Sequence, residues 1–389
     1  MPREPKLKQA APVGIKDIAR ELGVSIGTVD RALNGKPDIS AATRARVLDL
    51  AKRLGYTPNL AARYLQSRKP VRISVHLPRR ISLFWDALRD GIREAAAPFA
   101  PALHVDYRSY PRLGDGDIPL LEAAIADGTD GLIIAPGNPT ALAPHLREAA
   151  RRNIPVVCVV TDAPDSPRLL SVSADPFTVG AVAGELLGRF TPATGQVGFF
   201  TGWLATQDHA DKLRGFVSSL SASSPGLSLG PIIEAHDDER EAHQRARAVL
   251  RAHPHLKGLY VSTVNSMPVL RAAEEEGRLD GLTVITTDLF PELVDWIRAG
   301  KVAATVYQRP LTQGRVALQA LHQFLQRRER IPDSQRVVPY VVMRSNVDLV
   351  LERLSADKGG EADRPAPPRP DKRASSPRPR ATPRRRTNA

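Results

Sequence analysis

The chain has 389 residues, 42% of them hydrophobic, so it is long enough for two or three globular domains and is not mainly disordered. Its single cysteine, Cys158, excludes a disulfide framework, and the apolar run Val156–Val160 around it predicts a buried strand residue. No window approaches the roughly 18 apolar residues of a membrane span, and the charged start is followed by no apolar signal segment. We therefore expect a cytoplasmic protein without a membrane partner.

The net charge of +13 is concentrated at the two ends of the chain. Residues 1–70 carry 14 basic against 6 acidic side chains, residues 361–389 carry 9 against 3, and the stretch between them is nearly neutral. Basic ends on a neutral body are typical of a protein that binds a polyanion such as DNA. Solubility alone is the other explanation of this pattern.

Three short amphipathic helices are predicted at the start of the chain, because apolar residues recur with helical spacing in 15–22, 26–33 and 41–54. Ser25 and Ser40 are suitable N-caps for the second and third helix. Helix, glycine-containing turn and helix is the pattern of a helix-turn-helix, whose second helix enters the major groove of DNA. A generic three-helix bundle has the same periodicity.

From residue 71 the hydrophobic period changes, and short apolar runs alternate with helical stretches as far as residue 327. Such alternation is typical of βαβ units, with parallel sheets covered by helices on both faces. The region is longer than one open sheet commonly uses. We therefore expect two α/β subdomains within 71–354, one of about 71–174 plus 307–333 and the other of about 175–306 plus 334–354.

The last segment, 355–389, has no hydrophobic periodicity and is dominated by Pro, Arg, Ala and Ser. It is predicted to be disordered. Two roles are open for this basic tail: it adds nonspecific attraction to DNA, or it is inert.

The run Val13–Ser25, with Thr28-Val29, Arg31, Leu33-Asn34-Gly35 and Leu54–Asn59, resembles the head of the LacI/GalR family of repressors. The resemblance implies a flexible N-terminus over 1–12, a DNA-binding domain over 13–58, and a hinge helix with its linker over 59–70. The residues it implies at the DNA are Ser25, Ile26, Gly27, Thr28, Arg31, Asn34, Asn59, Arg63 and Leu65.

Within the second helix, 26–33, Arg31 is the one side chain able to make a bidentate contact with guanine. Leu65 matches the family's leucine that is wedged into a minor-groove step, although packing within a linker is the alternative. A seven-residue hinge helix is too short to be stable alone, so it should form only with DNA and a second subunit. Asp30 stands where the family usually has Ser, and a carboxylate there is repelled by phosphates.

Polar and aromatic residues follow the ends of several predicted strands, which is where ligands bind in open α/β sheets. Aromatic faces contact C–H surfaces, while Asp, Asn and Gln bind hydroxyl pairs, so the mixture suits a neutral polyol better than a phosphate. Residues 72–350 also resemble the type I periplasmic sugar-binding fold that LacI-family regulators share. The candidate effector-binding residues are Phe84, Trp85, Asp162, Lys212, Arg214, Asn265, Asp288 and Gln308.

The resemblance assigns these residues different roles. Phe84 and Trp85 match an aromatic pair that sandwiches the sugar, whereas Asp288 and Gln308 match ligands of its hydroxyls. Either Lys212 or Arg214 takes the place of a family arginine. Each also has a structural interpretation: core residues at a helix start for the aromatics, a helix cap for Asp288, a structural amide for Gln308, and a solvated helix face for the two cations.

Together these features predict a small all-α helix-turn-helix domain followed by a two-subdomain α/β fold of the type I periplasmic-binding-protein kind. The predicted function is sequence-specific transcription regulation, more often repression than activation, controlled by a sugar or polyol effector. The expected partners are a pseudo-palindromic, double-stranded operator and a second copy of the chain; no cofactor or metal is expected. The alternative is a sugar-binding protein without operator control; no catalytic constellation pointing to an enzyme is recognised.

Overall fold

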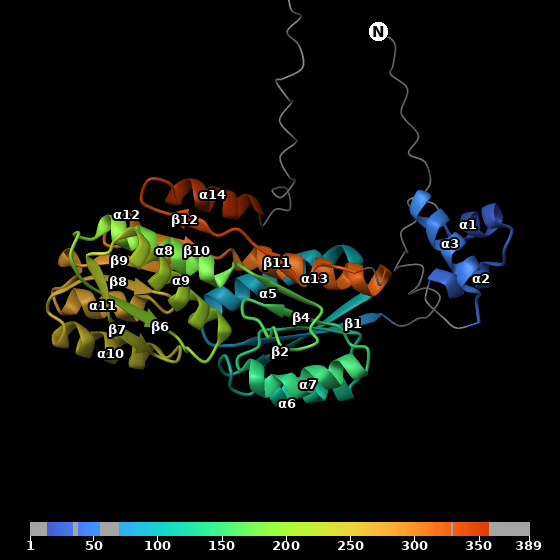
Figure 1. The fold of residues 1–389 in the computed structure, drawn as a ribbon, viewed down its shortest axis with the longest axis horizontal. Helices are drawn as coiled ribbons and strands as arrows, with labels where there is room; N and C mark the ends of the chain where they lie inside the picture. Colours follow the sequence, from blue (N-terminus) through green and yellow to red (C-terminus); the bar gives the residue numbers. More distant parts are fainter. Residues whose placement is uncertain (1–13, 34–37, 55–69, 328–329, 358–389) are drawn as a thin grey trace, which may run out of the picture. The chain divides into compact units, whose positions relative to one another are not determined.

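The computed structural model describes residues 14–33, 38–54, 70–327 and 330–357 (Figure 1). The chain divides into a large unit that ends at Arg344 and a small unit that begins at Ser345 and holds helix α14 (Val347–Asp357). Within these described ranges, no helix combines the length and the apolar character that crossing a bilayer requires.

The head consists of the three expected helices, α1 (Ile15–Leu22), α2 (Ile26–Leu33) and α3 (Ala41–Arg53). Their inner faces form a small core, made of Ile18, Ala19, Val29, Ala32, Val47, Leu50 and Ala51. Gly23 ends α1 in the left-handed conformation, with φ of 65°, which a residue without a β-carbon adopts at little cost. The all-α part of the predicted fold is confirmed.

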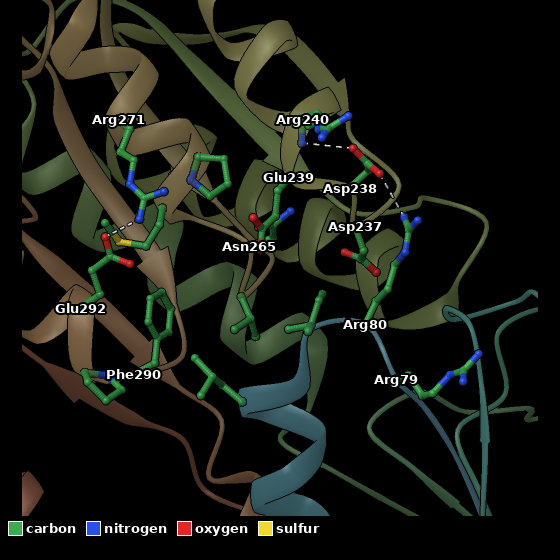
Figure 2. Close-up of a pocket in the computed structure, with 16 residues that line it drawn as sticks. Arg79, Arg80, Asp237, Asp238, Glu239, Arg240, Asn265, Arg271, Phe290 and Glu292 are labelled. Atoms are coloured by element: carbon green, nitrogen blue, oxygen red, sulfur yellow. Dashed lines mark hydrogen bonds and ion pairs between the residues drawn. The ribbon is translucent and has the colours of Figure 1, made fainter.

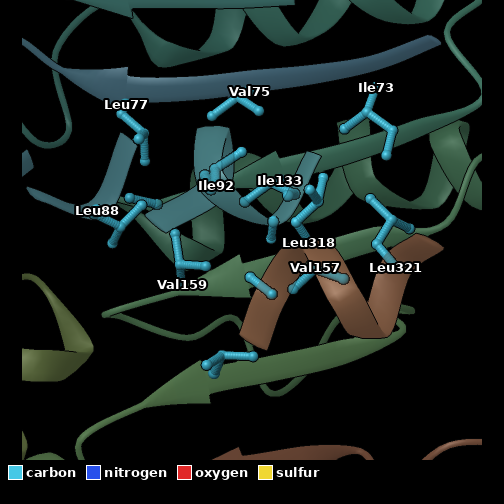
Figure 3. Packing of buried hydrophobic residues seen from close by; sticks show 14 of the residues in the cluster. Ile73, Val75, Leu77, Leu88, Ile92, Ile133, Val157, Val159, Leu318 and Leu321 are labelled. Atoms are coloured by element: carbon cyan, nitrogen blue, oxygen red, sulfur yellow. The ribbon is translucent and has the colours of Figure 1, made fainter. Parts of the chain in front are cut away.

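The first lobe of the body is a six-stranded parallel sheet in the order β11-β5-β4-β3-β1-β2. Helices α5 and α13 bury apolar side chains against one face of the sheet (Figure 3), and α6 and α7 cover the other. The strands are β1 (Val71–Pro78), β2 (Leu103–Tyr110), β3 (Gly131–Ile134), β4 (Val156–Val159), β5 (Leu170–Ser173) and β11 (Ser334–Arg336). The helices are α5 (Ser82–Ala96), η1 (Ala97–Phe99), α6 (Asp117–Ala126), α7 (Pro139–Arg151) and α13 (Pro310–Arg327).

The second lobe is a six-stranded sheet in the order β12-β10-β9-β8-β6-β7, in which β12 is antiparallel to β10. Helices α8 and α9 cover one of its faces. The strands are β6 (Gly195–Thr201), β7 (Leu227–Glu234), β8 (Leu256–Val261), β9 (Thr283–Thr287), β10 (Ala304–Tyr307) and β12 (Tyr340–Val342). The helices are α8 (Pro176–Phe190), α9 (Gln207–Ser223), α10 (Glu239–Ala252), α11 (Met267–Glu275), η2 (Leu279–Gly281) and α12 (Pro291–Arg298).

Two sheets in two lobes confirm the predicted fold class, but one boundary differs from the prediction. Ser334–Arg336 pairs with β5 in the first sheet, whereas residues from 334 onward were expected in the second lobe. All three residues of this strand are exposed, so it carries no apolar alternation by which the sequence could reveal it. The chain therefore returns to the second lobe only after β11.

In each lobe, two helices cross with their backbones in contact. A β-carbon on Gly91 of α5 would lie 1.9 Å from the carbonyl oxygen of Leu311 in α13, and one on Gly314 would lie 2.1 Å from that of Leu88. Neither distance is possible for a real side chain, so only glycine permits this approach. The close crossing fixes the position of the start of α5, which lies at the interlobe cleft.

Candidate functional site

The exposed face of α2 is the first candidate site. Ile26 is 47% exposed, and Ser25, Gly27 and Arg31 are also exposed. Val29 and Ala32 point the other way, into the core of the head. Hydrophobic exposure at Ile26 and a cation at Arg31, on the second helix of a helix-turn-helix, form a surface suited to contact with base edges.

Local hydrogen bonds hold the start of α2. The Ser25 hydroxyl accepts a hydrogen bond from the backbone N–H of Thr28 at 3.0 Å and lies 2.9 Å from the Thr28 hydroxyl. The Ser25 hydroxyl therefore caps the helix in the free protein, and Thr28 is half-buried. The remaining predicted DNA contacts, Asn34, Asn59, Arg63 and Leu65, lie outside the described residues.

The second candidate site is the cleft between the two lobes of the body. Arg80, just after β1, forms an ion pair with Asp238, the N-cap of α10, at 3.2 Å between Nη1 and Oδ2. Elsewhere between the lobes, the ring of Trp203 rests on the backbone of Gly114, where a β-carbon would lie 2.0 Å from Cζ3. Gly114 has φ of 78°, a conformation that favours glycine. The two lobes are thus in contact at both places.

An open cavity of about 850 Å³, the outer cavity, lies between the lobes (Figure 2). Such a volume is within the range of small-molecule sites. It is built from loops that follow β1, β7, β8 and β9, at the carboxyl ends of the strands, as expected for an α/β sheet. Its walls comprise Arg79, Arg80, Ile81, Leu83, Asp237, Asp238, Glu239, Arg240, Val264, Asn265, Met267, Pro268, Arg271, Phe290, Pro291 and Glu292.

The charges in the outer cavity are balanced, with four arginines and four acidic residues in its walls. Arg271 and Glu292 form an ion pair at 2.5 Å, and Figure 2 shows this pair and the Arg80–Asp238 pair on opposite sides of Asn265. The Asn265 Nδ2 atom is buried and makes no hydrogen bond with any described residue. A buried donor of this kind is costly unless a ligand or water satisfies it.

A much smaller cavity of about 30 Å³, the inner chamber, lies beside Asp288. Asp288 is 2% exposed, and its two carboxylate oxygens accept hydrogen bonds from Gln308, from the backbone N–H at 2.9 Å and from Nε2 at 2.7 Å. Asp288 has φ of 70°, which is strained for a residue other than glycine and is typical of functional positions. Burial raises the pKa of Asp288 to about 6, against the effect of the nearby Lys212.

A buried ion pair lies close to this carboxylate. Lys212 is 2% exposed, and its ammonium group donates to Asp208 Oδ2 at 2.8 Å. The other oxygen of Asp208 is buried and accepts no hydrogen bond within the described structure. The second lobe therefore has a strongly polar interior at the carboxyl ends of β6, β8 and β9.

The structure brings only some of the predicted effector residues to the cleft. Phe84, Asp288 and Gln308 are at the inner chamber or beside it, and Asn265 lines the outer cavity. Trp85 lies in the core of the first lobe, with its ring edge-to-face against Phe84 at 5.1 Å. The two aromatic rings therefore contact each other, and Trp85 lines neither cavity.

The other three candidates have protein partners. Asp162 forms a two-pronged ion pair with Arg168, in which Nη2 donates to Oδ2 at 2.7 Å. Arg214 is exposed and pairs with Asp211 at 2.5 Å, which agrees with its interpretation as part of a solvated helix face. Lys212, in contrast, is buried. Helix α12 has Phe290 as its N-cap, so the structure does not show Asp288 as the cap of that helix.

Sequence reasoning missed several residues of the site. Asp208 could have been found from its spacing of four residues from Lys212 on one helix. Arg80, Asp238 and Phe290 each lie shortly after a strand, so the rule that located Asp288 could also have located them. Nothing in the sequence indicates the contact between the Trp203 ring and the backbone of Gly114. Across the described residues, no group of three or more His, Cys, Asp or Glu side chains is placed to hold a metal ion.

Comparison with known proteins gives a match for the head and for the body. Residues 14–59 match the model of the bacterial regulatory proteins of the lacI family, and residues 73–329 match a periplasmic binding protein domain. Catabolite control protein A of Priestia megaterium is 27% identical over 267 residues, which cover 68% of this chain and 78% of the relative. The protein of that name from Staphylococcus aureus strain Mu50 is 30% identical over 235 residues, covering 58% of this chain and 66% of the relative.

Solved structures show the same fold for the body. GanP, a glucose-galactose binding protein from Geobacillus stearothermophilus, has a TM-score of 0.67 and 24% identity, and the match covers 72% of this chain and 99% of that one. A solute binding protein from Burkholderia graminis, in complex with D-arabinose, has the same TM-score and identity, with coverage of 72% and 96%.

The head and body together define a DNA-binding regulatory protein whose body has the fold of sugar-binding proteins. The periplasmic binding protein model spans well over half of the chain, and the lacI model covers the head. The chain belongs to the lacI family of bacterial regulatory proteins, with a periplasmic binding protein domain as its body.

Proposed function

We propose that this chain represses transcription as a homodimer bound to a pseudo-palindromic operator, and that a sugar or polyol in the interlobe cleft controls its affinity for DNA. The observation that carries the proposal is the combination, in one chain, of an outward-facing α2 surface with a body that holds a cavity of about 850 Å³ between its lobes. Neither feature alone supports a regulated DNA-binding protein.

At the DNA, Arg31 would contact a guanine edge, while Ile26 and Gly27 allow close approach of the α2 backbone to the bases. Ser25, which already caps α2, and Thr28 would contact phosphates at the helix N-terminus. Asn34, Asn59, Arg63 and Leu65 remain proposed contacts from the family resemblance. A helix-turn-helix that reads a palindrome requires two-fold symmetry, which supports a dimer.

In the body, the proposed effector contacts are Phe84, Asn265, Asp288 and Gln308. The walls combine apolar side chains with carboxylate and amide groups and balanced charge, which suits a neutral molecule that has several hydroxyls. The related sugar-binding proteins support this class of ligand through their shared fold. Because the cleft has walls from both lobes, an effector that fits the closed form favours closure, and DNA and effector must alter each other's affinity by the same factor.

The test uses the full-length chain. Selection from random duplexes should recover a palindrome, and a gel-shift titration should show that Arg31→Ala weakens binding to it more than binding to random DNA. Arg214→Ala is the matched control, because Arg214 is an exposed arginine on the body. A panel of pentoses, hexoses and cyclitols is then screened by thermal shift and added to the gel-shift assay. Recovery of no preferred sequence contradicts operator binding, and sugar binding that leaves DNA affinity unchanged contradicts effector control.

A further inference from the structure

Three apolar side chains separate the outer cavity from the inner chamber. Leu83, Val264 and Phe290 line both cavities, and we call these three residues the partition. Leu83 belongs to the first turn of α5 in the first lobe, while Val264 and Phe290 belong to loops of the second lobe. Val264 also packs against the core cluster of the first lobe. The partition therefore exists only while the two lobes are in contact.

Behind the partition, the inner chamber is small and polar at one end. Its volume of about 30 Å³ leaves space for about one or two water-sized groups. Asp288 lines this chamber, and its carboxylate accepts a hydrogen bond from the amide of Gln308, which is not part of the chamber wall, at 2.7 Å between Oδ2 and Nε2. The other walls are mainly apolar, so a group that enters has Asp288 as its strongest hydrogen-bond acceptor.

We propose that the partition seals the inner chamber on lobe closure and admits one small polar group of the effector, a hydroxyl or hydroxymethyl, to Asp288, while the rest of the effector lies in the outer cavity. This inference rests on the proposed function of the cleft as an effector site. It makes Leu83, Val264 and Phe290 the residues that determine which end of a ligand is accepted.

Selectivity follows from the difference in size between the two compartments. A substituent on the inserted hydroxyl has no space in the inner chamber and prevents the lobes from closing. A ligand that lacks the hydroxyl loses one hydrogen bond to a charged acceptor, while the two carboxylate oxygens of Asp288 keep their hydrogen bonds from Gln308. Extensions at the opposite end of the ligand meet only the open outer cavity and are tolerated.

The sealing of Asp288 can be tested without a ligand. A water-soluble carbodiimide with glycine ethyl ester labels accessible carboxyl groups, and peptide mass spectrometry follows Asp288 relative to Asp295, whose side chain is 76% exposed. In the full-length wild type, Asp288 should be labelled far more slowly than Asp295. Leu83→Ala and Phe290→Ala should each accelerate its labelling several-fold. Leu83 is already 57% exposed, so its truncation leaves the fold intact even if the Phe290 variant is unstable.

Met267→Ala is the matched control, because Met267 is an apolar residue that lines the outer cavity but not the inner chamber. It should leave the labelling of Asp288 unchanged. Three results would overturn the proposal: labelling of wild-type Asp288 as fast as Asp295, no acceleration in Leu83→Ala, or equal acceleration in Met267→Ala.

A sugar series gives the second readout, with D-galactose and its mono-O-methyl derivatives titrated into the same proteins. Methylation of one particular hydroxyl should weaken binding by about tenfold or more, and Leu83→Ala should recover most of that loss. Equal effects of methylation at every position, or no recovery in the variant, contradict the partition. If neither galactose nor any sugar of the wider panel binds, the proposed function fails, whereas the labelling experiment still decides whether the chamber is sealed.

Discussion

The backbone of α8 at Gly180 touches the backbone of α9 at Lys212, where a β-carbon on the glycine would lie 1.9 Å from the lysine carbonyl oxygen. The contact is reciprocal, because a β-carbon on Gly215 would lie 2.0 Å from the carbonyl oxygen of Phe177. Helix α9 carries both members of the buried Asp208–Lys212 ion pair. The glycine crossing therefore determines how deeply that pair is set in the second lobe.

Gly180→Ala should lower the free energy of unfolding by about 3 kcal/mol or more, because a methyl group there meets a carbonyl of the main chain, which cannot rotate aside. Gly281→Ala is the control: nothing lies within 4 Å of its β-carbon position, and it should change stability by less than about 0.5 kcal/mol. Urea unfolding of both variants measures the difference. Equal stabilities would show that the two helices separate at little cost.

Asp288 should make the stability of the body depend on pH. Its pKa is raised by burial to about 6 in the folded protein and is about 3.9 in an unfolded chain, so between these values the folded state binds more protons. Its contribution to the free energy of unfolding therefore falls as pH rises from about 4 to 6, by roughly 2–3 kcal/mol, and is constant above that range. His76, whose pKa burial lowers to about 4, acts in the opposite direction over a similar range.

For that reason the measurement is a difference between variants. The stability of Asp288→Asn relative to wild type should increase by roughly 2–3 kcal/mol between pH 4 and pH 7. Asp295→Asn, at an exposed position, should show no such trend. A difference for Asp288→Asn that is independent of pH would mean that the carboxyl group is better solvated than its burial indicates.

The Arg80–Asp238 pair should contribute little as an ion pair, because both side chains are more than a third exposed. Arg80→Ala should lower the free energy of unfolding by less than about 1 kcal/mol, and this difference from wild type should disappear in high salt. Asp238→Ala should lower the free energy of unfolding further, by about 1 kcal/mol in addition to the loss of the ion pair. The reason is that Asp238 also accepts hydrogen bonds from two backbone N–H groups of α10, each at 3.0 Å. Asp238→Asn keeps this cap and should resemble Arg80→Ala; chemical denaturation at two salt concentrations distinguishes the cases.

Gly27→Ala should separate stability from DNA binding in the head. The nearest atom to its β-carbon position is Ser25 Oγ at 3.7 Å, so alanine fits α2 without a clash. Alanine favours a helix over glycine, and amide hydrogen exchange in the head should slow by an amount equivalent to about 0.5–1 kcal/mol. Affinity for the selected palindrome should nevertheless fall, because the added methyl occupies the surface that approaches the bases. Undiminished affinity would place the DNA interface elsewhere.

Much of the fold could be predicted from the sequence, because long helices and buried strands have strong periodicity. The three head helices, with Ser25 and Ser40 as caps, are in the predicted positions. The strands that escaped prediction are β5, β11 and β12, which have three or four residues each. Length alone is not the reason, because β4 also has four residues and is predicted from its uninterrupted apolar run. β5 and β11 contain polar residues and β12 has only three residues, so the places of these strands depend on tertiary contacts that the local sequence does not encode.

The site was predictable in position but not in detail. Residues after strand ends do line the cleft, because parallel strands carry their carboxyl ends to one edge. Which of them have free polar groups could not be inferred, since that depends on partners far away in sequence, such as Gln308 for Asp288 or Arg168 for Asp162. The partition was missed for the same reason, because its three residues come from both lobes.

The contact between the Trp203 ring and Gly114 makes the fluorescence of Trp203 sensitive to the distance between the two lobes. Trp85 is buried in the first lobe and Trp296 stacks with Lys301 in the second, so lobe separation leaves the surroundings of both indoles nearly constant. Of the three tryptophans, only Trp203 loses its contact with the Gly114 backbone and becomes exposed to water when the lobes separate. With Trp85 and Trp296 replaced by phenylalanine, the emission colour of the remaining indole would report, in real time and without a dye, how wide the body is open.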